Sequence, residues 1–278
     1  MSYELTGASA LSDEPCRYGT SKLLVRGPRR DLDAPYLAFM GGTEVYGRFV
    51  ERPFVARLEE TLGRPCINLG SVNAGLDSFV QDEELTLVAR GADLTVLQVL
   101  GAQNISNRLY RVHPRRNDRF LQASDVLSEL YGEVDFTEFH FNKHLLTGLE
   151  SCSADRFASV RAELEAAWVA RMSQMIGALD GQVVLLWLRY DLGRDANSGA
   201  MLNQEPALVD RAMVDSLRSQ VQGVIELPVQ TAGGADDIDG MVFGQMDLPN
   251  AGHMIGPMEH MRIANAAAEG LRQVLARG

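Results

Sequence analysis

A hydroxyl side chain lies in a glycine-rich turn after the first apolar run of the chain. Residues 41–47 read Gly-Gly-Thr-Glu-Val-Tyr-Gly, with Thr43 directly behind two glycines. A hydroxyl held in such a turn can act as a nucleophile when a base removes its proton. The glycine spacing is not Gly-x-Gly-x-x-Gly, and the sequence has no Gly-Lys-Ser/Thr phosphate loop, which argues against nucleotide binding by this turn. A purely structural turn is the other interpretation.

Two further polar segments could supply donors for a developing negative charge. Residues 68–75 contain Gly70 and Gly75, whose lack of a side chain lets backbone N–H groups point at a ligand. Residues 101–107 contain Gln103 and Asn104, which add carboxamide donors. Two such donors beside a nucleophile form an oxyanion hole, so either glycine and either amide are candidates. The alternative is that these side chains cap loops and helix ends.

A histidine near the carboxyl terminus is the candidate base. His253 follows the segment Asp-Leu-Pro-Asn-Ala-Gly at residues 247–252 and precedes the last expected helix. A histidine on such a loop of an α/β sheet is well placed to act as general base. The carboxylate that would orient it is Asp247, with Asp239 as the alternative. Taken alone, a histidine here is more often an ordinary surface residue.

A short basic segment stands out in an acidic chain. Residues 111–119 read Arg-Val-His-Pro-Arg-Arg-Asn-Asp-Arg, whereas the formal net charge of the whole chain is −11 at pH 7. Guanidinium groups bind sulfate, phosphate or carboxylate through paired hydrogen bonds. We therefore expect five residues of this segment to contact an anionic substrate: Arg111, His113, Arg115, Arg116 and Arg119. The alternative is a solvated loop whose arginines pair with neighbouring acidic residues.

The sequence predicts no metal or cofactor site. Glu138, His140 and His144 fall on one expected helix, but their order is not His-Glu-x-x-His and no third ligand is evident. The aspartates near residue 237 lack the twelve-residue pattern of a calcium loop. The three cysteines have no metal-type spacing and fit reduced thiols in a reducing compartment.

The segments that must position these residues alternate between short apolar runs and helical patterns, which indicates βαβ units and a parallel sheet. We expect strands at residues 36–40, 65–69, 94–100, 183–188 and 224–229, and helices at residues 53–62, 78–90, 154–179, 206–221 and 258–275. Ligands of such sheets bind outside the carboxyl ends of the strands, where the polar segments described above stand. The sequence thus predicts an α/β three-layer sandwich with a five-stranded, mostly parallel sheet.

Length and composition fit a single domain over residues 1–278. The chain has no internal repeat or linker, and we expect an N-terminal extension at residues 1–34 and a helical insertion at residues 105–180. Residues 1–18 do not read as a secretory signal, and the longest apolar run, residues 183–188, is too short to cross a bilayer. We expect a cytoplasmic protein, and the acidic net charge argues against nucleic-acid or membrane partners.

From about residue 36 to residue 275, the order of the motifs resembles that of the SGNH (GDSL-type) hydrolases. That family has Gly-Asp-Ser after strand one, a glycine block after strand two, Gly-x-Asn-Asp after strand three, and Asp-x-x-His before the last helix. The resemblance implies a flavodoxin-like sheet, with Thr43 in the place of the nucleophilic serine and His253 in that of the base. In this chain Gly42 replaces the aspartate of the first motif, and Asn250 that of the last.

The resemblance implies a hydrolase or acyl transferase that acts on an ester of a small anionic or carbohydrate-linked substrate, without a cofactor. Because each motif is altered, a catalytically silent module that binds a glycan or an anionic ligand is the second interpretation. A sulfuryl-type transferase, with the arginines holding an anionic donor, is the third. The missing phosphate loop weakens that third interpretation.

Overall fold

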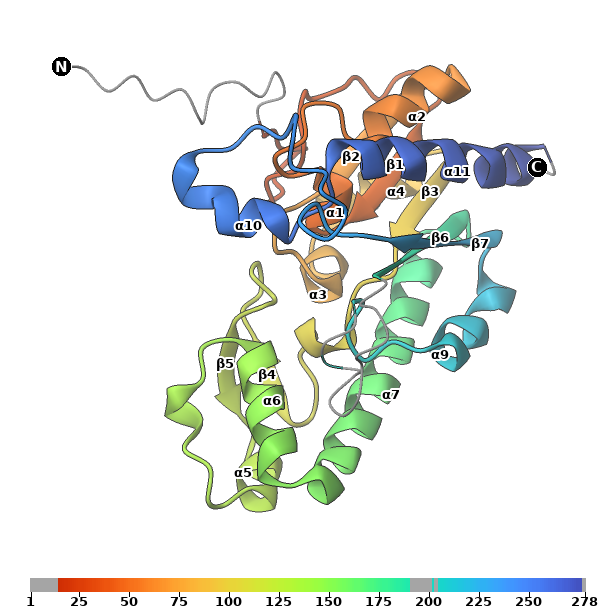
Figure 1. Ribbon diagram of the computed structural model, residues 1–278. Helices are drawn as coiled ribbons and strands as arrows, with labels where there is room; N and C mark the ends of the chain where they lie inside the picture. Colours follow the sequence, from red (N-terminus) through yellow and green to blue (C-terminus); the bar gives the residue numbers. More distant parts are fainter. Residues whose placement is uncertain (1–14, 191–201, 203–204, 277–278) are drawn as a thin grey trace.

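The computed structural model describes residues 15–190, 202 and 205–276. Its central sheet has five strands in the order β2-β1-β3-β6-β7 (Figure 1). The strands are β1 (Leu37–Gly41), β2 (Cys66–Gly70), β3 (Leu94–Gln98), β6 (Val183–Tyr190) and β7 (Gly223–Val229). All four pairs of neighbouring strands are parallel. The expected α/β class with a five-stranded sheet is therefore confirmed.

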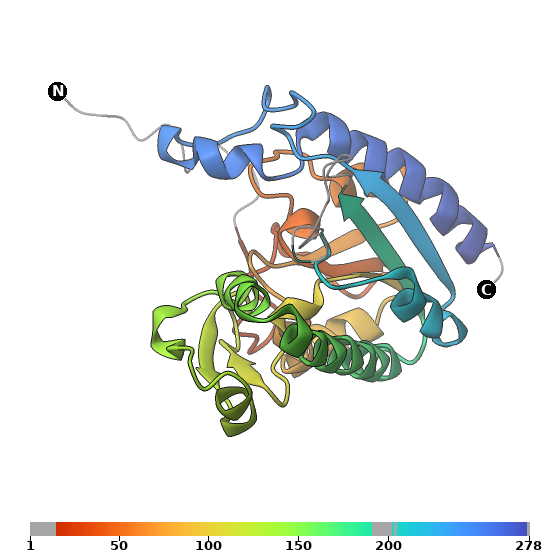
Figure 2. The ribbon, with the colours of Figure 1, turned by 60° about the horizontal axis from the view of Figure 1, so that its bottom comes forward.

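Helices cover both faces of the sheet and complete the three-layer sandwich (Figure 2). On one face pack α2 (Phe54–Leu62) and α11 (Pro257–Leu275). On the other face pack α4 (Glu83–Arg90), α7 (Ala154–Ala178) and α9 (Arg211–Ser216). Each helix turns an apolar stripe toward the sheet, as the spacing of its apolar residues predicts. None of the helices in the described part of the chain is long and apolar enough to span a membrane.

The strands read as nearly continuous apolar runs because the sheet is covered on both faces. β1 has the sequence Leu-Ala-Phe-Met-Gly, and all five of its residues are buried. Since successive side chains of a strand point to opposite faces, Leu37 and Phe39 enter the core beneath α2 and α11. Ala38 and Met40 enter the core on the other face. The strand ends at Gly41, where the first candidate segment begins.

A small lobe is inserted between β3 and α7 and lies below the sheet in Figure 1. It contains an antiparallel hairpin and further helical segments: η1 (Ala102–Asn104), β4 (Tyr110–Val112), β5 (Phe120–Ala123), α5 (Asp125–Leu130), η2 (Phe136–Glu138) and α6 (Asn142–Cys152). The expected helical insertion thus includes a hairpin. Its strands are too short for hydrophobic periodicity to reveal.

Two expected helices differ in extent from the prediction. The helix expected at residues 78–90 is divided into α3 (Leu76–Val80) and α4, because the Asp82 carboxylate accepts a hydrogen bond from Leu85 N and so begins a new helix. Within residues 206–221 only α9 and the short η3 (Arg218–Gln220) form. Of the expected N-terminal extension, residues 1–14 lie outside the described residues, and the side chains of Leu23 and Val25 are buried in the core.

Candidate functional site

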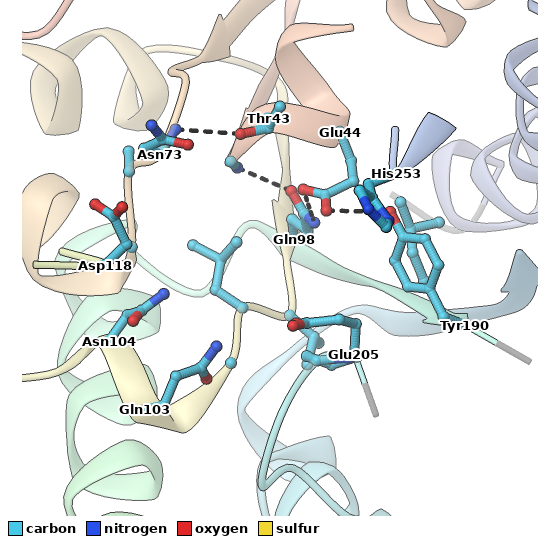
Figure 3. A pocket seen from close by; sticks show the side chains of 18 of the residues that line it. Thr43, Glu44, Asn73, Gln98, Gln103, Asn104, Asp118, Tyr190, Glu205 and His253 are labelled. Atoms are coloured by element: carbon cyan, nitrogen blue, oxygen red, sulfur yellow. Dashed lines mark hydrogen bonds between the residues drawn. The ribbon is translucent and has the colours of Figure 1, made fainter. Parts of the chain in front are cut away.

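The segments that follow all five strands of the sheet, together with residues of the small lobe, enclose a cavity of about 550 Å³ at the carboxyl ends of the strands (Figure 3). This is where an open parallel sheet binds its ligands. Several residues selected from the sequence line the cavity: Thr43, Gly75, Gln103, Asn104 and His253. Eight polar side chains that were not selected also line it: Glu44, Asn73, Gln98, Asp118, Lys143, Tyr190, Glu205 and Thr231.

Thr43 is the first residue of α1 (Thr43–Tyr46), directly behind β1 and Gly42. Its half-buried hydroxyl oxygen accepts a hydrogen bond from the backbone N–H of Asn73 at 3.1 Å. Asn73 has a φ of 58°, in the left-handed region that asparagine tolerates better than most residues. The loop between β2 and α3 therefore brings one backbone donor to the Thr43 hydroxyl.

The two alternative oxyanion glycines, Gly70 and Gly75, both donate their backbone N–H groups to side chains of the protein. The Gly70 N–H donates to Asn68 Oδ1 at 2.9 Å, and the Gly75 N–H donates to Asn117 Oδ1, also at 2.9 Å. Because both N–H groups are engaged, neither is available to a ligand in this structure. A Cβ atom on Gly70 would lie 2.2 Å from the backbone nitrogen of Tyr46. Only glycine lets β2 and α1 approach this closely.

The two carboxamides after β3 differ in their partners. Asn104 Oδ1 accepts a hydrogen bond from Asn142 Nδ2 at 2.9 Å, which ties the loop to α6. Gln103 is only 8% exposed, and its Oε1 atom is buried without a hydrogen-bond partner among the described residues. Since buried polar atoms are nearly always paired, a donor group of a ligand in the cavity could satisfy this oxygen.

A polar network next to Thr43 fixes the position of the Glu44 carboxylate. Gln98 accepts the Gly42 N–H through Oε1 at 2.9 Å and donates from Nε2 to Glu44 at 3.0 Å. The Tyr190 hydroxyl donates to the other Glu44 oxygen at 3.2 Å (Figure 3). Burial and the charge of Glu44 raise the pKa of Tyr190 well above its ordinary value. Tyr190 therefore stays protonated and remains a donor to Glu44.

Glu205 supplies a carboxyl group that can exchange a proton near neutral pH. Burial, and after it the negative charge of Glu44, raise the pKa of Glu205 to about 7, while Lys143 acts in the opposite direction. A pKa close to the working pH suits a group that both donates and accepts a proton. Glu205 is therefore a candidate proton donor or acceptor.

His253 follows α10 (Leu248–Gly252) as an exposed side chain of the cavity wall. Its imidazole forms no hydrogen bond with a described residue, including Asp247 and Asp239. Asp247 closes η4 (Gln245–Asp247) and forms an ion pair with Arg48 at 3.5 Å. Figure 3 shows the Thr43 hydroxyl directed toward Asn73 and not toward His253. The structure thus brings Thr43 and His253 to one cavity without joining them to Asp247 in a triad.

The basic segment at residues 111–119 includes the turn between β4 and β5, and it lies beside the cavity. Four of the expected contact residues line a separate hollow: His113, Arg115, Arg116 and Arg119. Arg111 is exposed and lines neither hollow. The arginines therefore face away from the cavity that holds Thr43, because the hairpin turns them to its other side. Only Asp118 of this segment lines that cavity.

Three functional candidates were missed in the sequence. Asn73 had a usable signal, because an asparagine in a glycine-rich loop often adopts positive φ. Glu44 directly follows Thr43 and belongs to the same polar turn. Glu205 stands in no motif, and only the folded environment distinguishes it from other glutamates. Within the described residues no group of three or more His, Cys, Asp or Glu side chains is arranged to hold a metal ion.

A search of curated proteins found no match to this chain. Residues 1–275 match the model of a family described as Domain of unknown function (DUF6473). This match covers nearly the whole sequence, from the N-terminal segment through the last helix, and the chain therefore belongs to the DUF6473 family.

Proposed function

We propose that this protein is a hydrolase or acyl transferase of the SGNH type, with Thr43 as its nucleophile and an ester of a small molecule as its substrate. The hydrogen bond from Asn73 N to Thr43 Oγ1, inside a cavity at the carboxyl ends of the strands, carries the proposal. A donor 3.1 Å from the attacking oxygen is also near the point where the ester carbonyl oxygen becomes negatively charged. The strand order and the succession of loops around the cavity add support.

The reaction begins when Thr43 Oγ1 attacks the ester carbonyl and its proton passes to His253. As Thr43 Oγ1 bonds to the carbonyl carbon, the Asn73 N–H passes from that oxygen to the resulting oxyanion, which the Gln103 carboxamide also stabilises. As the bond between the carbonyl carbon and the leaving alcohol breaks, Glu205 protonates the alcohol oxygen. Its pKa of about 7 leaves a fraction of this group protonated near neutral pH. Water, or a second alcohol, then attacks the acyl carbon and gives its proton to Glu205, while His253 returns its proton to Thr43 Oγ1 as the bond between that oxygen and the acyl carbon breaks.

This mechanism requires the Thr43 hydroxyl and His253 to approach each other when the substrate binds. Catalytic hydrogen bonds are often long or misaligned without substrate and tighten in the complex. The His253 imidazole is exposed and forms no hydrogen bond with a described residue, so no side-chain hydrogen bond has to break when it moves. The proposal assigns no orienting role to Asp247, because that carboxylate pairs with Arg48.

The lining of the cavity supports a polar substrate. Carboxamide, carboxyl, hydroxyl and ammonium groups face the same space, among them Gln103, Asp118, Lys143 and Tyr190. Hydroxyl groups of a carbohydrate can both donate to and accept from such side chains. We therefore favour an acyl ester of a carbohydrate-linked alcohol over a long-chain lipid ester.

The test is hydrolysis of p-nitrophenyl acetate and of acetylated sugars by the wild type and by variants of Thr43. We expect Thr43→Ala to lose activity by at least about 100-fold, and Thr43→Ser to retain or raise it, because serine offers the same oxygen with less crowding. Thr61→Ala is the matched control, since Thr61 is an exposed threonine of α2 outside the cavity. Equal activity of Thr43→Ala and the wild type would remove Thr43 from the mechanism.

A catalytically silent binding module is the second candidate, favoured by the missing contacts between Thr43, His253 and Asp247. In that case the wild type neither hydrolyses these esters nor forms an acyl adduct on Thr43 that mass spectrometry detects. The cavity would still bind an acetylated sugar, and calorimetry would detect that binding. Turnover by the wild type, with an acyl group trapped on Thr43, excludes this second candidate.

A further inference from the structure

A second hollow, of about 770 Å³, lies beside the cavity of the candidate site. The N-terminal segment from Pro15 to Leu24, the loop after β2 and the β4–β5 hairpin with its turn form its walls. Five cationic side chains line it: Arg17, Lys22, Arg115, Arg116 and Arg119. We call this hollow the basic groove.

The cations of the basic groove have no acidic partners in the part of the chain that the structure describes. No Asp or Glu occurs among the described residues that line it, and none of its five cations forms an ion pair with any described residue. This differs from many other arginines of the chain, such as Arg30 and Arg211, which pair with Glu59 and Glu226. Acidic residues outnumber basic ones by 37 to 26 in the whole chain. Five like charges around one hollow repel each other, and an anion between them relieves that repulsion.

The turn that carries three of the arginines is held in place by backbone hydrogen bonds. His113 Nδ1 accepts from Arg115 N at 3.2 Å and from Arg116 N at 3.1 Å. The Arg119 N–H donates to Arg116 O at 2.9 Å, and the Arg119 guanidinium lies 4.2 Å from the centre of the Phe141 ring. A fixed turn reduces the entropy lost when these side chains bind a ligand.

The basic groove is separate from the cavity, although the two share a wall. Neighbouring residues of the wall face opposite hollows: Val72 lines the groove while Asn73 lines the cavity, and Arg119 lines the groove while Asp118 lines the cavity. Asn117, which directly precedes Asp118 in the sequence, is fully buried in this wall. A ligand of the groove therefore does not need to enter the space next to Thr43.

The number and type of charges indicate the class of ligand. Each guanidinium can donate two parallel hydrogen bonds to oxygens of one phosphate group. A single phosphate carries about two negative charges at neutral pH, which is fewer than the five cations that line the groove. Exposed apolar side chains at its rim, Leu24 and Leu121, can contact an uncharged part of the ligand. The strongly acidic whole chain disfavours a long polyanion such as nucleic acid.

We propose that the basic groove is a binding site for a small molecule that carries a diphosphate group. The proposal does not depend on the activity proposed for Thr43. It predicts that the Thr43→Ala variant binds this ligand as well as the wild type does. The proposal also assigns Arg17 and Lys22, from the N-terminal part of the chain, to the same site as the arginines of the hairpin.

The test is calorimetric titration of the full chain with inorganic pyrophosphate, and separately with ADP, at two salt concentrations. We expect the double variant Arg115→Gln, Arg116→Gln to raise the Kd for both by at least about tenfold, since it removes two charge-assisted contacts. The matched control is Arg111→Gln, Arg272→Gln, which removes the same charge from two exposed positions outside both hollows. Neither pair forms an ion pair with a described residue, and Arg272 makes one exposed hydrogen bond, to Thr61 O, so thermal melts of both variants should stay close to that of the wild type.

Binding by the wild type that the groove variant loses and the control retains supports the proposal. Tighter binding of ADP than of pyrophosphate identifies a nucleotide-like ligand, and equal binding identifies the diphosphate itself as the recognised group. The proposal is overturned if millimolar pyrophosphate and ADP do not bind the wild type. It is equally overturned if the groove variant and the control lose affinity to the same extent, because the binding is then a general effect of net charge.

Discussion

The substitution Glu205→Gln should stabilise the folded protein at alkaline pH. Burial beside Glu44 raises the pKa of Glu205 from 4.5 to about 7, so ionisation is less favourable in the folded than in the unfolded state. At pH values between these two pKa values the folded state binds more protons than the unfolded state. The free energy of unfolding therefore falls as the pH rises. At pH values above the folded-state pKa, this pKa difference of Glu205 lowers the free energy of unfolding by about 3 kcal/mol. Glutamine keeps the shape of the side chain and carries no charge, so it removes this cost.

The measurement is urea unfolding of the wild type and Glu205→Gln across a series of pH values. We expect the variant to be more stable by about 3 kcal/mol near pH 8, and the difference to vanish near pH 4.5. Comparing the two proteins at each pH cancels the contributions of all other groups. Glu129→Gln is the control, because Glu129 is an exposed residue of α5 without an ion pair to a described residue, and its substitution should leave the profile unchanged.

One result would refute this reasoning. If Glu205→Gln is as stable as the wild type at pH 8, or less stable, the carboxylate of Glu205 is not disfavoured in the folded state. Its role as an acid near neutral pH would then be withdrawn from the proposed mechanism. A pH-independent gain in stability would also count against it, because that gain would come from packing and not from ionisation.

Three further substitutions test the structure around the site. Gly70→Ala should lower the free energy of unfolding by about 2 kcal/mol, because the new methyl group clashes with the backbone of Tyr46. Urea unfolding measures this change, and an unchanged midpoint would contradict it. Asn117→Ala should cost about 3 kcal/mol in the same assay, since it leaves several buried partners without a hydrogen bond. His260→Gln should flatten the acid side of the stability profile: burial lowers the pKa of His260 to about 3, so the wild type loses stability as the pH falls below 6.5. Glutamine can still accept the Phe54 N–H, and a slope between pH 6.5 and pH 4.5 equal to that of the wild type would exclude His260 as a source of it.

The sheet could be predicted because its residues obey a local rule. The strand β1 is apolar throughout, and β3 contains only Thr95 and Gln98 as polar residues; such runs are typical of strands covered on both faces. The positions of Thr43 and His253 at one cavity then follow from topology, because segments after parallel strands meet at the same edge of the sheet. Both features are therefore independent of the details of side-chain packing.

The remaining features of the site depend on contacts that a linear pattern does not contain. The N–H groups of Gly70 and Gly75 are engaged by Asn68 and Asn117, and the partner of Gly75 lies in a lobe more than forty residues further along the chain. The pKa of Glu205 is set by burial, which no motif encodes. The direction of the arginines depends on which side of the hairpin faces the cavity, and a short hairpin gives no periodic signal.

Asn117 also limits how this family can vary. Its Oδ1 atom accepts from Gly75 N, Ser78 N and Ser78 Oγ, while its Nδ2 donates to His113 O. The small lobe and the loop after β2 thus share one buried amide. A homologue that exchanges the β4–β5 hairpin for another loop must also supply new partners for residues 75–78. The two segments should therefore change together in evolution, and a chimaera that transfers the lobe alone should fold poorly.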